Sequence, residues 1–184
     1  MTKDDPWYVH AILYTVIVLL VALLVKVAVL DPKEEVASEK YNKTESRLRM
    51  KNIKEAEILW EKKFGRFTAS LDSLVNFIKS DPMVKQVRSG FDSLSKRPTD
   101  PFVNLSHNEF SPDSLYRTPK SWQYYSVQID TSEQADTVVN RQGKVLRVEK
   151  YTVIGKRYFI EDPDGYGTVG SLNDDALKNT SSWE

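Results

Sequence analysis

The sequence contains no cysteine and only two histidines in 184 residues. Without cysteine the chain has no disulfide bonds, no thiolate metal ligands and no cysteine nucleophile. Neither His10 nor His107 belongs to a helical pair of metal ligands. The sequence also lacks a nucleophile elbow, a phosphate-binding loop and a dinucleotide fingerprint. These absences predict a protein that is not an enzyme.

The sequence also lacks a net charge of either sign. The 26 lysines and arginines balance 26 aspartates and glutamates. Because nucleic-acid binding depends on a basic face, we expect no nucleic-acid partner. The apolar residues, by contrast, are distributed very unevenly along the chain.

Residues 7–30, "WYVHAILYTVIVLLVALLVKVAVL", hold much of the apolar content. About 20 apolar residues cross a bilayer as a helix. Trp7 and Tyr8 suit the headgroup layer at one end, and Lys26 can extend its ammonium group outward at the other. The run is longer than a signal-peptide core, and the following "KVAVLDP" lacks a small-x-small cleavage pattern. A buried core helix would be apolar on one stripe only. We therefore predict an uncleaved, single-pass signal anchor in the lipid bilayer.

The anchor divides the chain into four expected parts. Residues 1–6 form a short head, residues 7–30 the anchor, residues 31–50 a polar helical stalk and residues 51–184 a globular domain with a loop-rich tail. The orientation has two interpretations. The basic residues that follow the anchor favour a cytoplasmic domain by count, whereas short amino-terminal heads commonly stay inside the cell.

A long helix is predicted over residues 33–64, which contain no glycine or proline and are rich in helix formers. Its first half is polar on every face, as expected of a solvated stalk. In its second half Ile53, Ala56 and Trp60 recur at spacings of three and four and predict a face that packs on a globular domain. Gly65 is expected to end the helix as a left-handed cap.

A second helix is predicted from a cap at Thr68 or Ser70 to a stop at Pro82. Residues 83–121 are rich in serine, proline and aspartate and are expected to form a long connection with short turns or helical pieces.

After residue 121 the pattern of side chains changes to a period of two residues. Three segments alternate and are rich in aromatic and β-branched residues: "WQYYSVQID", "KVLRVEKYTVI" and "KRYFIED". They are separated by "TSEQAD", "RQG" and Gly155-Lys156. The pattern predicts three or four antiparallel strands. A long helix packed on a small antiparallel sheet places the chain in the α+β class.

This order of parts resembles the major pseudopilins of type II secretion and the related type IV pilins. The segment "NIKEAEILWEKKFGRFTASLDSLV" is similar to the pseudopilin pattern of a helix, a Gly-Arg-aromatic triplet and a second helix. The tail "DPDGYGTVGSLNDDALKNTSSWE" resembles the family's closing Asp-Gly-rich run that ends in tryptophan. The apolar segment contains neither the glycine nor the glutamate of a prepilin processing site. The resemblance therefore implies a permanently anchored relative with a pilin-like head.

In that family the acidic tail loop holds calcium. The matching residues here are Asp162, Asp164, Asn173, Asp174 and Asp175. Calcium takes six to eight oxygen ligands, and these side chains supply oxygen donors. Asp-Pro, Asp-Gly and Asn-Asp pairs are also ordinary turn formers, so a plain turn is the alternative. Trp183 is expected to pin the tail by packing.

Two functions follow from these observations. The first is a structural or accessory subunit of a secretion or surface-assembly complex, with other envelope proteins as partners. It would sit in the inner (cytoplasmic) membrane with a periplasmic head. The second is a membrane-tethered module that binds a ligand or calcium through residues 83–121 and 161–184.

Overall fold

The computed structural model describes residues 7–93, 96–139 and 145–184. The chain divides into two compact units, Met1–Asn42 and Lys43–Glu184. Its class is α+β: a long apolar helix at the amino terminus and small antiparallel sheets further along. The α+β prediction is therefore confirmed.

The first unit is helical throughout its described part. Helix α1, Trp7–Val25, buries none of its residues, and it continues through the π-helical turn η1, Lys26–Leu30, into α2, Asp31–Phe64. Pro32 explains the π turn, because proline lacks an N–H and its ring clashes with the carbonyl four residues earlier. By length and composition the helix can cross a membrane, a criterion that an amino-terminal signal sequence also meets.

The second unit begins within α2 at Lys43. The expected stalk ended at residue 50, but Glu45, Ser46 and Met50 are fully buried. This part of the helix is polar in composition and still packed, because its polar side chains have protein partners. Helix α2 ends at Phe64, and Gly65 follows with a φ of 72°, which confirms the predicted left-handed cap.

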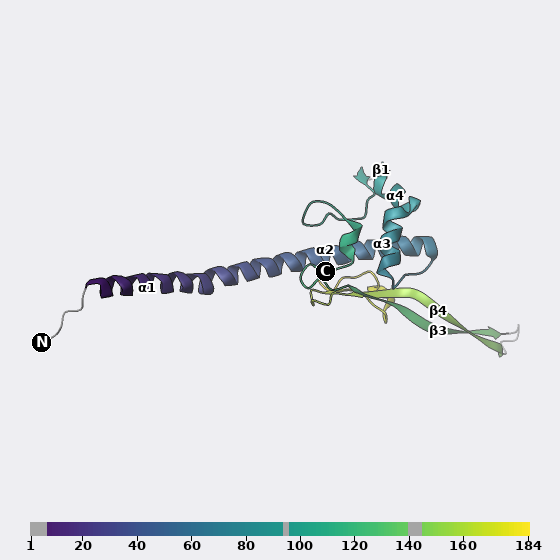
Figure 1. Cartoon of the computed structure of the whole chain (residues 1–184). Helices are drawn as coiled ribbons and strands as arrows, with labels where there is room; N and C mark the ends of the chain where they lie inside the picture. Colours follow the sequence, from purple (N-terminus) through teal and green to yellow (C-terminus); the bar gives the residue numbers. More distant parts are fainter. Residues whose placement is uncertain (1–6, 94–95, 140–144) are drawn as a thin grey trace. The chain divides into compact units, whose positions relative to one another are not determined.

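Two shorter helices pack beside α2 in this unit (Figure 1). Helix α3, Leu71–Ser80, starts at Ser70, whose side chain accepts a hydrogen bond from the Ser73 N–H group. It buries Leu74, Val75, Phe77 and Ile78. Helix α4, Pro82–Ser89, follows at once, with Asp81 as its cap. Pro82 thus ends one helix and begins another, because the first helical position needs no N–H group.

The connection after α4 contains short elements. Strands β1, Phe91–Asp92, and β2, Arg97–Pro98, form a small antiparallel pair, and η2, Pro112–Leu115, is a 3-10 turn. The main sheet has the order β3-β4-β5, all antiparallel. Its strands are Ser126–Val139, Val145–Glu161 and Thr168–Gly170, and the short helix η3, Asp175–Leu177, follows.

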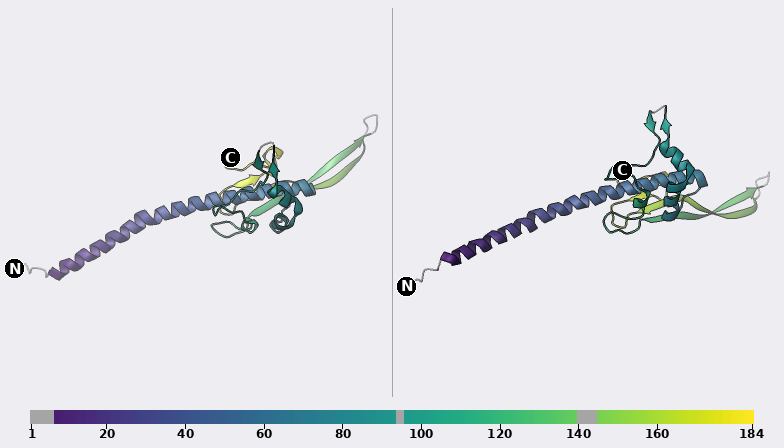
Figure 2. Two further views of the ribbon diagram at one scale, coloured as in Figure 1. Left: turned by 90° about the horizontal axis from the view of Figure 1, so that it is seen from above. Right: turned by 45° about the horizontal axis from the view of Figure 1, so that its top comes forward.

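Strands β3 and β4 form one long twisted ribbon (Figure 1), and it continues beyond the rest of its unit in further views (Figure 2). The predicted breaks at "TSEQAD" and Gly155-Lys156 were therefore wrong, since both lie inside strands. A register shift falls between Ile129 and Thr131. Gly155 has a φ of 73° and allows the opposing strand to continue past the shift. The predicted break at "RQG", residues 141–143, lies outside the described residues.

The core of this unit lies between α2, α3 and the sheet. Its fully buried side chains include Met50, Ile53, Leu74, Leu115 and Tyr158. Phe67 packs on Tyr158 with ring centroids 4.6 Å apart, and Trp60 packs on Phe77 at 5.2 Å. The predicted packing face of α2 is confirmed by this core.

Candidate metal site in the acidic tail

Asp162 is the one buried residue among the five calcium candidates, with 3% of its surface exposed. Its Oδ2 atom accepts a short hydrogen bond from the Ser46 hydroxyl on α2. Ser46 Oγ lies 2.9 Å from the Tyr125 hydroxyl. Because the Ser46 proton is directed at the carboxylate, Tyr125 is the donor of this second bond. Burial raises the Tyr125 pKa, which keeps that proton in place.

The other oxygen of Asp162 closes a turn. Its Oδ1 atom accepts a hydrogen bond of 2.7 Å from the Asp164 N–H group, and the Gly165 N–H group bonds to the Asp162 carbonyl at 3.0 Å. Gly165 has a φ of 77°, which suits glycine. The "DPDG" segment is therefore a turn held by its own first aspartate, as the turn interpretation predicts.

Asp164 faces a different loop. Its Oδ2 atom accepts from the Ser121 N–H group at 3.2 Å. Burial opposes ionisation, but hydrogen bonds from Ser121 and Thr118 and the charge of Lys120 outweigh it and lower the Asp164 pKa. Asp164 is thus ionised and joins the tail to residues 118–121.

The remaining three candidates serve local roles further along. The Asn173 N–H group donates to Ser171 Oγ at 3.2 Å. Asp174 caps η3 by accepting from the Ala176 N–H group at 2.8 Å. Asp175 lies 3.7 Å from Arg157 Nε with its side chain 83% exposed. Asp162 and Asp164 therefore bond toward Ser46 and Ser121, whereas Asp174 and Asp175 bond toward η3 and β4.

Within residues 7–93, 96–139 and 145–184, no group of three or more histidine, aspartate or glutamate side chains is arranged to hold a metal ion. A surface pocket of about 240 Å³ does adjoin Asn173, lined also by Gln128, Phe159 and Ser171. Calcium binding by the tail stays a prediction that a titration must decide.

The carboxyl-terminal residues are pinned to α2 at a second point. Arg47 Nε donates to the Tyr166 carbonyl at 3.1 Å, and its guanidinium group lies 5.1 Å from the centre of the Trp183 ring. Trp183 packs partly buried against the core, which confirms its expected packing role. The tail is therefore part of the folded unit.

Sequence reasoning missed a polar stripe on α2. Glu45, Arg49 and Asn52 lie at spacings of four and three and face one side of the helix. Glu45 Oε2 accepts from the N–H and hydroxyl groups of Ser106 at 3.0 and 2.5 Å. Asn52 exchanges two hydrogen bonds of 2.8 Å with the Val103 backbone. The spacing of these three residues was visible in the sequence. Their partners Val103 and Ser106, however, lie in a connection without a periodic pattern.

Arg49 completes this stripe. It pairs with Glu45 at 3.0 Å and donates to the Arg117 carbonyl at 2.7 Å. Burial of Glu45 opposes its ionisation, but the bonds from Ser106 and the charge of Arg49 outweigh it and lower the Glu45 pKa. The stripe therefore fixes the connecting loops by charge-assisted hydrogen bonds.

Glu57 on α2 has the most perturbed carboxyl group described. It is fully buried, and burial raises its pKa to about 8. One oxygen accepts from the Thr68 N–H group at 3.1 Å, while Oε1 has no hydrogen-bond partner among the described residues. Its neighbour Tyr158 is a core residue, so Glu57 is a neutral acid inside the core and does not line an open site.

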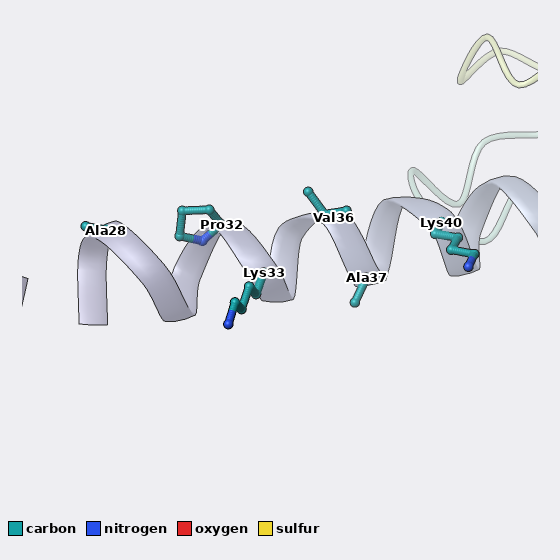
Figure 3. A pocket seen from close by; sticks show the side chains of 6 residues that line it. All are labelled: Ala28, Pro32, Lys33, Val36, Ala37 and Lys40. Atoms are coloured by element: carbon teal, nitrogen blue, oxygen red, sulfur yellow. The ribbon is translucent and has the colours of Figure 1, made fainter. Parts of the chain in front are cut away.

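A hollow of about 450 Å³ also lies on the first unit, lined by Ala28, Pro32, Lys33, Val36, Ala37 and Lys40 (Figure 3). All six residues come from successive turns of one helix, so the hollow has a single wall. Small-molecule sites enclose most of the ligand surface. The hollow is therefore helix surface and not a ligand site.

Comparison of the chain with protein-family models, curated proteins and solved structures finds no match. The resemblance to pseudopilins accordingly rests on the order of the elements and on the two quoted segments. Function has to be argued from the chemistry of the surfaces themselves.

Proposed function

We propose that this protein is a non-enzymatic, single-pass membrane protein of the bacterial envelope. In this role it is a structural or accessory subunit of a secretion or surface-assembly complex. One observation carries the proposal: α1 is apolar on all sides and buries no residue, whereas Lys43–Glu184 has a core of its own. A bilayer is the solvent that such a helix requires.

The architecture of the unit Lys43–Glu184, which we call the head, supports the pilin-like part of the proposal. One long helix, α2, packs on a small antiparallel sheet. The carboxyl-terminal tail returns to that helix, where Asp162 bonds to Ser46 and the Tyr166 carbonyl bonds to Arg47. A head whose surface carries exposed aromatic rings, such as Trp122 and Tyr124, is suited to contacts with other subunits.

We further propose that the anchor is uncleaved and that the head lies in the periplasm, on the outer side of the inner membrane. The cysteine-free sequence allows a direct test. Asn76→Cys on the exposed face of α3 should react with a membrane-impermeant maleimide in intact inner-membrane spheroplasts. Thr2→Cys should react only after the membrane is opened. The reverse pattern would place the head in the cytoplasm, and an intact mass without residues 1–30 would show cleavage.

The partner test is mild-detergent purification of the full-length protein from its native membrane, followed by mass spectrometry. A stable set of other envelope proteins is the expected result. Recovery of the chain with no other envelope protein would contradict the proposed subunit role.

The alternative is a membrane-tethered binding module, which is favoured by the pocket beside Asn173. This function requires a ligand or calcium to stabilise the isolated full-length protein. Ligand stabilisation of a chain that travels without partners would favour the binding module over the subunit role.

A further inference from the structure

The first part of α2, residues 31–42, is a charged helix that belongs to the first unit. All of its residues except the two at its ends are exposed. An exposed polar helix is stabilised by pairs of opposite charge three or four residues apart. Four of its charged residues have no residue of opposite charge at those spacings: Asp31, Lys33, Glu34 and Glu35. The segment therefore lacks local pairs that would stabilise it alone.

Three acidic residues, which we call the acidic row, share one face of this segment. Asp31, Glu35 and Glu39 follow one another at intervals of four residues, and like charges at that spacing repel. Bases lie beyond the ends of the row, Lys26 in η1 and Lys43 four residues after Glu39. Glu35, at the centre, has only acidic or uncharged residues three and four positions away. The centre of the row is therefore a negative surface.

Lys33 and Lys40, which we call the basic row, share another face. They are seven residues apart and lie about 150° around the axis from the acidic row, at 100° per residue. Val36 and Ala37 lie between the two lysines along the helix (Figure 3), and all four line the hollow of about 450 Å³. Glu34 is about 100° from Lys33 and thus nearer the acidic row. The small side chains of the basic face allow close approach of a second helix.

The bilayer constrains how the rows of two copies meet. Each copy carries the same apolar helix α1, so copies side by side in a membrane are parallel and at the same depth. With a rise of 1.5 Å per residue, Lys33 of one copy stands midway between the levels of Asp31 and Glu35 of its neighbour, about 3 Å from each. Lys40 stands about 1.5 Å from the level of Glu39. Both lysines therefore meet the acidic row without a shift along the helix.

We propose that the basic row of one copy packs against the acidic row of a second copy, side by side in the bilayer. The rows lie on different faces, so the contact is heterologous and can repeat from copy to copy. Exposed ion pairs are individually weak, but confinement to one membrane raises the effective concentration of the partners. The inference rests on the proposed membrane anchor and adds a second copy of the chain as a partner.

Charge reversal tests the contact in liposomes of neutral phosphatidylcholine. Full-length protein with Asn76→Cys carries donor or acceptor dyes, and energy transfer measures association. The lysine-reversed variant combines Lys33→Glu with Lys40→Glu, and the glutamate-reversed variant combines Glu35→Lys with Glu39→Lys. Each variant alone should associate at least about tenfold more weakly than the parent, because like charges then face each other. Glutamate and lysine are both good helix formers, so each variant should keep the helix.

Mixing the two variants tests the pairing of the rows. Each row of one variant is opposite in charge to the facing row of the other, so the mixture should regain most of the parent's association. A chain with all four changes should regain it as well, because its rows are exchanged in sign. Lys51→Glu with Lys62→Glu is the matched control, since it changes the net charge equally at two exposed sites on α2. This control should associate like the parent.

Three results would each overturn the proposal: a monomeric parent chain, reversed variants that associate like the parent, or a mixture no stronger than its components. Association that requires anionic lipid and ignores the glutamate changes would also overturn it and assign the lysines to lipid headgroups. Flotation of the parent with the liposomes tests the anchor separately. A chain that floats and stays monomeric contradicts this contact alone, whereas a chain that does not float contradicts the anchor as well.

Discussion

Ser46 on α2 donates a hydrogen bond to Asp162 in the tail, 116 residues further along the chain. The bond is buried at both ends, since Ser46 is fully buried and Asp162 is 3% exposed. The same hydroxyl accepts from Tyr125 just before β3. One serine therefore joins the long helix, the entry to the sheet and the tail.

Replacing Asp162 should destabilise the head. Asp162→Ala leaves the Ser46 hydroxyl without its acceptor and opens the turn to Asp164, so we expect a loss of about 2–3 kcal/mol in the free energy of unfolding. Urea unfolding of the full-length protein, followed by tryptophan fluorescence, measures the change. Ser46→Ala combined with Asp162→Ala should cost less than the sum of the single changes.

Asp174→Ala is the matched control for this prediction. It removes only the exposed cap of η3, so we expect a loss of about 1 kcal/mol or less. Equal losses at Asp162 and Asp174 would contradict the special role of the buried aspartate.

Calcium at 1 mM should leave the melting temperature of the full-length protein unchanged relative to a chelator. The reason is that Asp162, Asp164 and Asp174 already accept hydrogen bonds from protein groups in separate places. A calcium-dependent rise in melting temperature that Asp174→Ala abolishes would instead establish the calcium site that the resemblance to pseudopilins implies.

Stability of the head should fall as pH rises from about 4.5 to about 8 because of Glu57. Its pKa is raised from 4.5 to about 8 in the folded chain. Below pH 4.5 the Glu57 carboxyl is protonated in both the folded and the unfolded chain, so no free energy of unfolding is lost through its ionisation. Between the two values only the unfolded chain releases the proton, which costs about 1.4 kcal/mol per pH unit. Urea unfolding at several pH values measures the slope.

Glu57→Gln should flatten that slope, because an amide stays neutral in both states. Glu55→Gln, two residues away on the same helix and half-buried, is the control and should keep it. Glu45 and Asp130 have lowered pKa values. Their stabilising contributions are therefore lost as the pH falls into the acid range, below the window from about pH 4.5 to about pH 8 in which Glu57 acts. An unchanged slope in Glu57→Gln would show that another group governs the pH dependence.

Gly155→Ala should be among the most damaging changes in β4. Gly155 has a φ of 73°, and an added Cβ would lie 2.8 Å from the Phe67 carbonyl oxygen. That backbone is held by a 2.8 Å bond from the Phe67 N–H group to the Gly155 carbonyl. We expect a loss of about 3 kcal/mol or more in the free energy of unfolding.

Gly65→Ala separates the strain of a left-handed backbone from the close contact with Phe67. Gly65 has a similar φ of 72°, but an added Cβ meets nothing within 4 Å. It should therefore cost about 1 kcal/mol, the strain of the left-handed backbone alone. Similar losses at Gly65 and Gly155 would remove the argument from close contact.

Periodicity predicted the helices well. The apolar face of α2 and the cap at Gly65 were visible because both depend on neighbours within a few residues. The continuous β3–β4 ribbon was missed because Gly155 and polar residues look like turns in isolation. Asp130 stabilises the irregularity by accepting bonds of 2.8 and 3.2 Å from Arg157 N and Nε across the ribbon, a pairing with no local signal.

The candidate site divides in the same way. The turn at "DPDG" followed from local chemistry, whereas burial of Asp162 depends on Ser46 and Tyr125, which are distant in sequence. Trp122 had no signal beyond its place in a predicted strand. Its left-handed backbone is set by Thr118 and Arg117, so only the folded turn reveals it.

The long-range partners of α2 also set the order in which the protein can mature. Ser46 cannot meet Asp162 until 116 further residues have been made, a delay of about 6–23 s at typical synthesis rates. Arg47 waits still longer for Trp183, which lies 136 residues further along the chain. The helix that organises the head therefore leaves the ribosome early with its buried polar groups unpartnered. The head closes only after Trp183 has been made, and a nascent chain stalled before residue 162 remains open to proteases and chaperones.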